Sequence, residues 1–133
     1  MEAILNSFAV KEGHCPYSLG VQSISKYCNE RGHEVKMISS KPKNADGEIE
    51  KILSYNPSVV GFSSNYVTEP MVLKMIKKIK EKRKNKTFIV VGGPSVTYSS
   101  EGSRIRQSEA DLFVRVMGKK LFMKSSKMDP LQY

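Results

Sequence analysis

The sequence has few cysteines and no long apolar run, and both absences restrict what the protein can be. Of its 133 residues only Cys15 and Cys28 are cysteines, and without C-x-x-C spacing they predict neither a disulfide scaffold nor a zinc site. No stretch approaches the roughly 20 apolar residues of a membrane span. Met1 to Val10 has no basic segment ahead of a long apolar one, so no secretory signal is expected. These absences favour a reduced, cytoplasmic protein with no membrane partner.

Motifs for the common nucleotide ligands are also missing. No G-x-G-x-x-G follows the first apolar segment and no glycine-rich loop carries a Walker-type lysine, which argues against dinucleotide and nucleoside triphosphate sites. A phosphoacceptor domain would carry an aspartate where the third apolar segment ends in Gly61-Phe62-Ser63-Ser64. A small-molecule enzyme remains an alternative. Its best candidates are Glu12, His14 and Cys15, but they do not form a convincing set of acid, base and nucleophile.

Positive charge is abundant and concentrated in one segment. Lys and Arg number 22 against 13 Asp and Glu, which gives a formal charge of +9 at pH 7. The segment Lys74 to Lys86 is dominated by cations and has Glu81 as its single acid. Such a run is usually a solvated helix face. The alternative is a non-catalytic nucleic-acid or protein interaction domain that uses this face. Because the segment contains one arginine and no aromatic residue to stack on bases, nucleic acid is the less favoured partner.

Short apolar segments alternate with amphipathic ones, which is typical of an α/β protein. Strands are expected at residues 3–10, 34–39, 58–62, 87–91 and 112–114. Helices are expected at residues 18–31, 46–55, 69–84 and 98–107. The pattern predicts a doubly wound, Rossmann-like or flavodoxin-like sheet of five parallel strands with helices on both faces. We expect one domain at residues 3–117, and a short C-terminal helix or disordered tail at residues 118–133.

Small residues follow the third and fourth expected strands, where a doubly wound sheet binds its ligand. Gly92 and Gly93 have no side chains, so a bulky group can approach the backbone there. Ser63 and Ser64 place hydroxyl groups beside them on the neighbouring strand. A turn without a ligand would explain either pair alone. Together the two pairs favour a large planar or nucleotide-tailed ligand.

Five segments, in the same order, resemble the N-terminal cobalamin (B12)-binding domain of B12-dependent radical SAM enzymes. They are Pro16-Tyr17-Ser18-Leu19-Gly20, Arg31-Gly32-His33-Glu34-Val35, Pro57-Ser58-Val59-Val60-Gly61-Phe62-Ser63, Val90-Val91-Gly92-Gly93-Pro94 and Asp111-Leu112-Phe113-Val114-Arg115. The resemblance implies that the corrin ring lies over the carboxyl ends of the strands. It also implies that the nucleotide tail enters a groove lined by the serine and glycine loops. The residues it assigns to cofactor contacts are Ser63, Ser64, Gly92, Gly93, Pro94, His14 and Tyr17.

Two departures from the family pattern bear on function. The wider cobalamin-binding fold often has D-x-H-x-x-G after its first strand, with the histidine ligating cobalt, whereas this chain keeps only the acid-x-His spacing of Glu12 and His14. His14 is therefore either an axial cobalt ligand oriented by Glu12 or an exposed loop histidine.

The second departure follows Arg115, where the family's Gly-Glu-Gly-Glu segment is absent, and no C-x-x-x-C-x-x-C motif occurs. We therefore expect a truncated or excised domain that is not catalytic by itself. It would present cobalamin to a radical SAM domain that performs methyl transfer or related chemistry, and the iron–sulfur cluster and SAM would lie in that missing domain.

Overall fold

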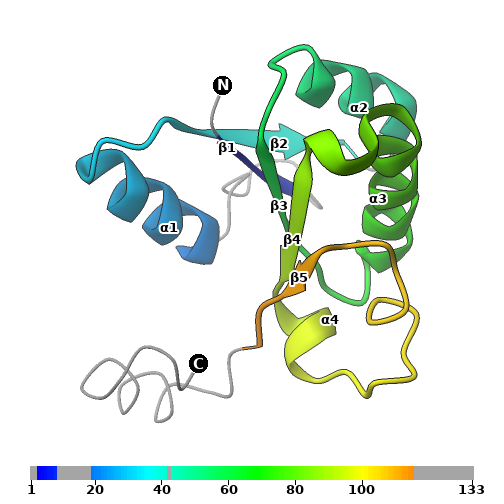
Figure 1. Ribbon diagram of the computed structural model, residues 1–133. Coiled ribbons are helices and arrows are strands. Elements are labelled where there is room, and N and C mark those ends of the chain that lie inside the picture. The colour runs from blue at the N-terminus through cyan, green and yellow to red at the C-terminus, as the bar shows by residue number, and fades with distance from the viewer. Residues whose placement is uncertain (1–2, 9–18, 42, 116–133) are drawn as a thin grey trace, which may run out of the picture.

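The strands of the protein form one parallel sheet, and helices pack on both sides of it (Figure 1). The computed structural model describes residues 3–8, 19–41 and 43–115. The strands are β1 (Ala3–Phe8), β2 (Val35–Ser40), β3 (Val59–Ser63), β4 (Phe88–Gly92) and β5 (Leu112–Phe113). The helices are α1 (Leu19–Glu30), α2 (Ala45–Leu53), α3 (Glu69–Arg83), the 3-10 helix η1 (Lys84–Lys86) and α4 (Pro94–Thr97). The predicted five-stranded, doubly wound fold is confirmed.

The strand order, β2-β1-β3-β4-β5, places the first strand inside the sheet. Ala3 of β1 pairs with Val35 of β2 on one side and with Val59 of β3 on the other. The order reverses between β1 and β3. Right-handed crossovers therefore send α1 to one face of the sheet and α2 and α3 to the other, as Figure 1 shows. A reversal of this kind leaves a crevice at the carboxyl ends of the strands, where ligands bind.

The main hydrophobic core lies between the sheet and the two helices α2 and α3. Helix α3 buries Val72, Met75, Ile76 and Ile79, whose spacing forms a single helical stripe. The sheet and α2 contribute Ile4, Phe8, Ile38, Val60, Phe62, Ile89, Val91, Ile49 and Ile52 to the same cluster. Within the described residues, no helix is long and apolar enough to cross a membrane.

The opposite face of the sheet, which α1 covers, keeps several apolar side chains in contact with solvent. Phe88 of β4 is 46% exposed, Leu112 of β5 is 47% exposed, and Val114, directly after β5, is 41% exposed. Ile24 of α1 is also 53% exposed. A single helix therefore covers only part of this face in the region that the structure describes, and the rest forms an open apolar surface.

The predicted helix at residues 98–107 is wrong. The helix in this region is α4, which begins at Pro94 and ends at Thr97, and turns follow it. Serine side chains bond locally to the backbone instead: the Ser99 hydroxyl donates to the Val96 carbonyl at 2.7 Å, and the Ser108 hydroxyl to the Ile105 carbonyl at 2.7 Å. Such bonds compete with helix formation. Residues 9–10 of the first predicted strand and the predicted C-terminal segment 118–133 lie outside the described residues.

Candidate functional site

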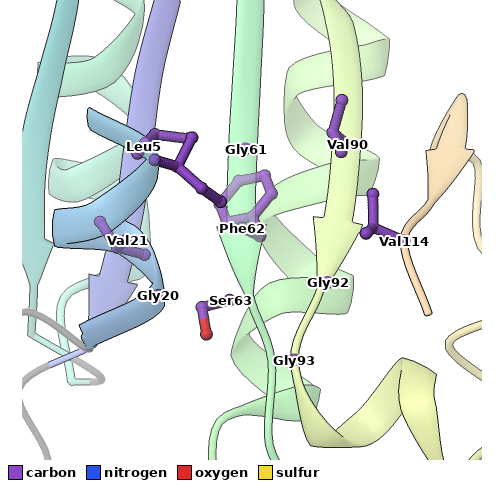
Figure 2. A pocket seen from close by; sticks show the side chains of 11 residues that line it. Leu5, Gly20, Val21, Gly61, Phe62, Ser63, Val90, Gly92, Gly93 and Val114 are labelled. Carbon is purple, nitrogen blue, oxygen red and sulfur yellow. The ribbon is translucent and has the colours of Figure 1, made fainter. Parts of the chain in front are cut away.

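An apolar groove lies on the α1 side of the sheet, near the carboxyl ends of the strands (Figure 2). Its volume is about 270 Å³, close to the lower end of the range of roughly 300–1,000 Å³ for small-molecule and cofactor pockets. It is lined by Leu5, Gly20, Val21, Ile24, Gly61, Phe62, Ser63, Val90, Gly92, Gly93 and Val114. These residues come from α1, from three strands and from the segments after β4 and β5, so the groove exists only once the sheet is assembled.

The groove owes its depth to glycines. A β-carbon at Gly92 would lie 3.7 Å from the Val114 carbonyl oxygen, which is ordinary contact, and larger side chains would extend into the groove. A β-carbon at Gly61 would lie 2.7 Å from a methyl group of Leu5, and one at Gly20 would have no neighbour within 4 Å. Backbone therefore forms the floor of the groove, and a bound group can approach it closely.

The two serines at the end of β3 have different environments. Ser63 is half-buried and lines the groove, and Figure 2 shows its hydroxyl projecting into the space in front of the sheet. Among the described residues, no hydrogen-bond partner of this hydroxyl is found. Ser64 is fully buried instead: its hydroxyl donates to the Ser95 hydroxyl at 3.1 Å, and its N–H donates to the Gly92 carbonyl at 2.9 Å. Ser63 is thus placed to meet a ligand, whereas Ser64 joins the ends of β3 and β4.

Gly93 has an internal reason to be glycine besides its place in the groove. Its φ is 97° and its ψ −177°, a backbone conformation that side chains disfavour. A β-carbon there would lie 2.6 Å from the Ser64 carbonyl oxygen and 2.9 Å from the Ser64 nitrogen. Pro94, the next residue, is exposed and begins α4. Gly93 therefore allows the loops after β3 and β4 to pack closely, and Gly92 leaves the space beside them open.

Side-chain hydrogen bonds fix two elements that border the groove. In the loop after β3, the side-chain oxygen of Asn65 accepts the N–H groups of Val67 and Thr68, both at 2.9 Å. At the end of α1, the Asn29 side chain accepts the Val35 N–H at 3.1 Å and donates to the Val35 carbonyl at 3.3 Å. The first contact orders the rim of the groove, and the second joins α1 to β2.

Asp111 secures the start of β5. One of its carboxylate oxygens accepts the Lys80 ammonium at 2.6 Å and the Ile89 N–H at 2.8 Å. Desolvation acts to raise the pKa of this carboxyl, but the hydrogen bonds from Lys80 and Ile89 and the charge of Lys80 outweigh it, so the pKa lies below its usual value. The ion pair joins α3, β4 and β5.

Arg115 secures the other end of the same segment. Its guanidinium donates to the carbonyl oxygen of Thr97, the last residue of α4, at 3.0 Å and to that of Ser99 at 2.7 Å. The preceding residue, Val114, lines the groove and donates its N–H to Val91 at 2.8 Å. The Asp-x-x-x-Arg spacing therefore anchors a groove wall at both ends.

The basic segment Lys74 to Lys86 is separated from the groove. Helix α3 covers the face of the sheet opposite α1 (Figure 1). Its Lys74, Lys77 and Lys82 are exposed, whereas the Lys80 side chain is only 11% exposed. Lys80 pairs with Asp111, and Lys82 pairs with Glu50. The position of this segment fits a solvated helix face, and it contributes no side chain to the groove lining.

Several predicted residues cannot be placed. His14 and Tyr17 lie outside the described residues, as do Glu12 and Cys15. Among the residues that the structure describes, no group of three His, Cys, Asp or Glu side chains could hold a metal ion. Cys28 of α1 carries a free thiol. The axial ligand and the alternative catalytic set therefore stay predictions.

Sequence reasoning found the serine and glycine loops but missed the walls of the groove. The missed residues are Leu5, Gly20, Val21, Ile24, Gly61, Phe62, Val90 and Val114. Strand alternation was the available signal, because Gly61 lies two residues before Ser63, and Val90 two before Gly92, on the same face of the sheet. The contribution of α1 had no comparable signal, since its register against the sheet depends on packing.

Comparison with known proteins identifies a family and a similar fold. The family model described as "B12 binding domain" matches residues 8–123. Among solved structures, the chain is similar to a novel cobalamin-binding protein from Desulfitobacterium hafniense DCB-2, with a TM-score of 0.64 and 18% sequence identity. That alignment covers 96% of this chain and 58% of the other, so this chain spans little more than half of its length. No curated protein matches the sequence.

Proposed function

Since the chain belongs to the family of B12-binding domains, we propose that it is a cobalamin-binding module and that its groove holds the nucleotide tail of the cofactor. The observation that carries this proposal is the groove itself: a glycine floor, apolar walls and the Ser63 hydroxyl at its edge. The tail of cobalamin ends in a flat bicyclic base, and such a group needs close approach to backbone and apolar contact on its faces. The residues present therefore fit this part of the cofactor.

The loop after β3 provides a surface on which the corrin ring can bind. Tyr66 and Val67 are 73% and 70% exposed, in the loop after β3 that Asn65 holds in place. Large apolar side chains on an ordered loop favour contact with a broad apolar ligand. When bound, cobalamin supplies a cobalt centre suited to methyl transfer or radical rearrangement. The work of this chain is to bind the ring and tail and hold them in one orientation.

His14 and Tyr17 extend the proposal to the loop after β1. An imidazole is a good cobalt ligand, and Glu12, two residues away, could orient it. Replacing His14 with alanine should then abolish the shift in the visible spectrum that binding of hydroxocobalamin produces. An identical shift in the variant would assign His14 to the loop surface and leave cobalt ligation to other groups.

We further propose that the module serves a catalytic domain of the radical SAM type. Support comes from the five sequence segments that resemble such enzymes. Methyl transfer or a related reaction, the iron–sulfur cluster and SAM would all belong to that partner domain. Sequencing the gene and its flanking region tests this: a C-x-x-x-C-x-x-C motif in the same reading frame supports it, and a gene neighbourhood without one argues against it.

Cobalamin binding itself is tested by mixing the purified protein with hydroxocobalamin, removing free cofactor by gel filtration and recording the visible spectrum. Coloured protein is expected, and protein that elutes colourless at high concentration would overturn the proposal. Gly92→Val should fill the groove and reduce binding, because the added side chain extends into it. Gly102→Val is the matched control, since a β-carbon at Gly102 meets nothing within 4 Å and Gly102 is outside the groove lining.

A further inference from the structure

The side chains in the walls of the groove offer little hydrogen-bonding capacity. Helix α1 contributes Val21 and Ile24, and the sheet side contributes Leu5, Val90 and Val114. Among the described residues that line the groove, Ser63 alone has a polar side chain. The backbone of the floor takes part in the sheet, because Gly61 pairs with Val90 and Gly92 pairs with Ser63 in the β3–β4 ladder. The Gly92 carbonyl also accepts the Ser64 N–H.

From this composition, and resting on the proposed function, we infer that the groove selects corrinoids by the base at the end of their tail. It favours an apolar bicyclic base such as 5,6-dimethylbenzimidazole over a purine such as adenine. The two bases have similar outlines, so shape alone would not separate them. Their edges differ: the benzimidazole presents methyl groups where adenine presents an amino group and ring nitrogens.

The physical reason is desolvation. An amino group or ring nitrogen that leaves water and finds no partner loses its hydrogen bonds to solvent, whereas methyl groups gain from burial. The Ser63 hydroxyl can satisfy one acceptor, but adenine carries several polar atoms that would face Val21, Ile24, Val90 or Val114. One unpaired polar group in a buried site weakens binding by about ten- to a hundredfold. We expect the adenine-containing corrinoid to bind more weakly than cobalamin by this factor.

The experiment compares three ligands by absorbance titration of the purified chain: cobalamin, the corrinoid with adenine as its lower base, and cobinamide, which has no nucleotide tail. Tight binding of cobalamin, intermediate binding of the adenine form and weak binding of cobinamide are expected. Equal affinity for cobalamin and the adenine form, with both above cobinamide, would overturn the selectivity alone. Equal affinity for cobalamin and cobinamide would overturn the placement of the tail in the groove, and hence the proposal on which this inference rests.

A pair of variants tests the cause. Val90→Thr exchanges a methyl group for a hydroxyl of similar size in the groove wall and suits a strand. It should narrow the ratio of the two affinities, because the added hydroxyl is left unpartnered beside benzimidazole and finds polar atoms on adenine. Val59→Thr makes the same exchange on β3, at a half-buried residue of the same sheet face that is not part of the groove lining. It should leave the ratio unchanged. An unchanged ratio in Val90→Thr would overturn the inference.

Discussion

Replacing Gly93 with alanine should strongly destabilise the protein. The φ of 97° and ψ of −177° at this residue lie in a region that is almost restricted to glycine, where another residue costs on the order of 1–3 kcal/mol. In addition, the new β-carbon would lie 2.6 Å from the Ser64 carbonyl oxygen and 2.9 Å from the Ser64 nitrogen. Both atoms belong to the backbone, so no side-chain rotation relieves the contact.

The size of the loss in unfolding free energy follows from the hydrogen bonds that hold Ser64 in place. Its N–H donates to Gly92 at 2.9 Å, and its carbonyl accepts the Ser95 N–H at 3.0 Å. Relief of the contact must lengthen at least one of these bonds, each worth about 0.5–1.5 kcal/mol. Together with the backbone conformation, the expected loss is about 3 kcal/mol, a large share of the roughly 5–15 kcal/mol that stabilises a typical domain.

Urea unfolding followed by circular dichroism measures the loss. With a dependence of about 1–3 kcal/mol per molar urea, the midpoint should fall by at least about 1 M. Gly102→Ala is the matched control, because its φ is not positive and its β-carbon would have no neighbour within 4 Å. It should leave the midpoint unchanged or raise it slightly. Equal midpoints for the two variants would refute the argument that contact with Ser64 requires glycine at position 93.

Two further predictions concern the serine pair and the ion pair at β5. Ser64→Ala should lower the free energy of unfolding in urea by about 1–3 kcal/mol, because it leaves the buried Ser95 hydroxyl without its partner. Ser63→Ala should change the free energy of unfolding by less than about 0.5 kcal/mol. A larger loss in Ser63→Ala than in Ser64→Ala would contradict the roles assigned to the two serines. Asp111→Asn should destabilise the protein by on the order of 1 kcal/mol, whereas Glu50→Gln, at the exposed pair with Lys82, should have a smaller effect. The lowered pKa of Asp111 means that its contribution is complete above the usual aspartate value of about 3.9 and is lost as the pH falls through the lower folded-state value. Acid titration of unfolding should therefore show a shallower loss of stability in Asp111→Asn than in the unmodified protein, and parallel curves would contradict this assignment.

Much of the fold could be predicted because each strand is a separate apolar run. Ile89 and Val91 bury themselves against α3, and the segment around them needs no distant partner to be recognised as a strand. The region after Pro94 could not be predicted in the same way. Ile105 is fully buried in the core, but turns place it there rather than a helix, and the local serine bonds that favour those turns depend on geometry that spacing does not reveal.

The candidate site was predictable at its loops and not at its walls. Ser63 and Ser64 are adjacent residues of the same type, so composition does not distinguish them. Strand alternation does: Ser63 lines the groove, whereas Ser64 is buried against Ser95. The contacts of α1 depend on how the helix sits on the sheet, which Asn29 helps to fix through Val35. The hydrogen bonds between Asn29 and Val35 join residues across a turn, and no periodicity in the sequence predicts them.

The position of Val114 links ligand binding to the completion of folding. Val21 and Ile24 belong to α1, the first described helix, and Val114 follows the last described strand, β5, of which only two residues pair with β4. A ligand in the groove would contact all three residues. It would therefore link α1, near the start of the described chain, to the segment after β5, near its end. Because it binds only the assembled form, its binding free energy adds to the stability of β5. During synthesis, the complete groove, with Val114 in its wall, can form only after β5 has emerged.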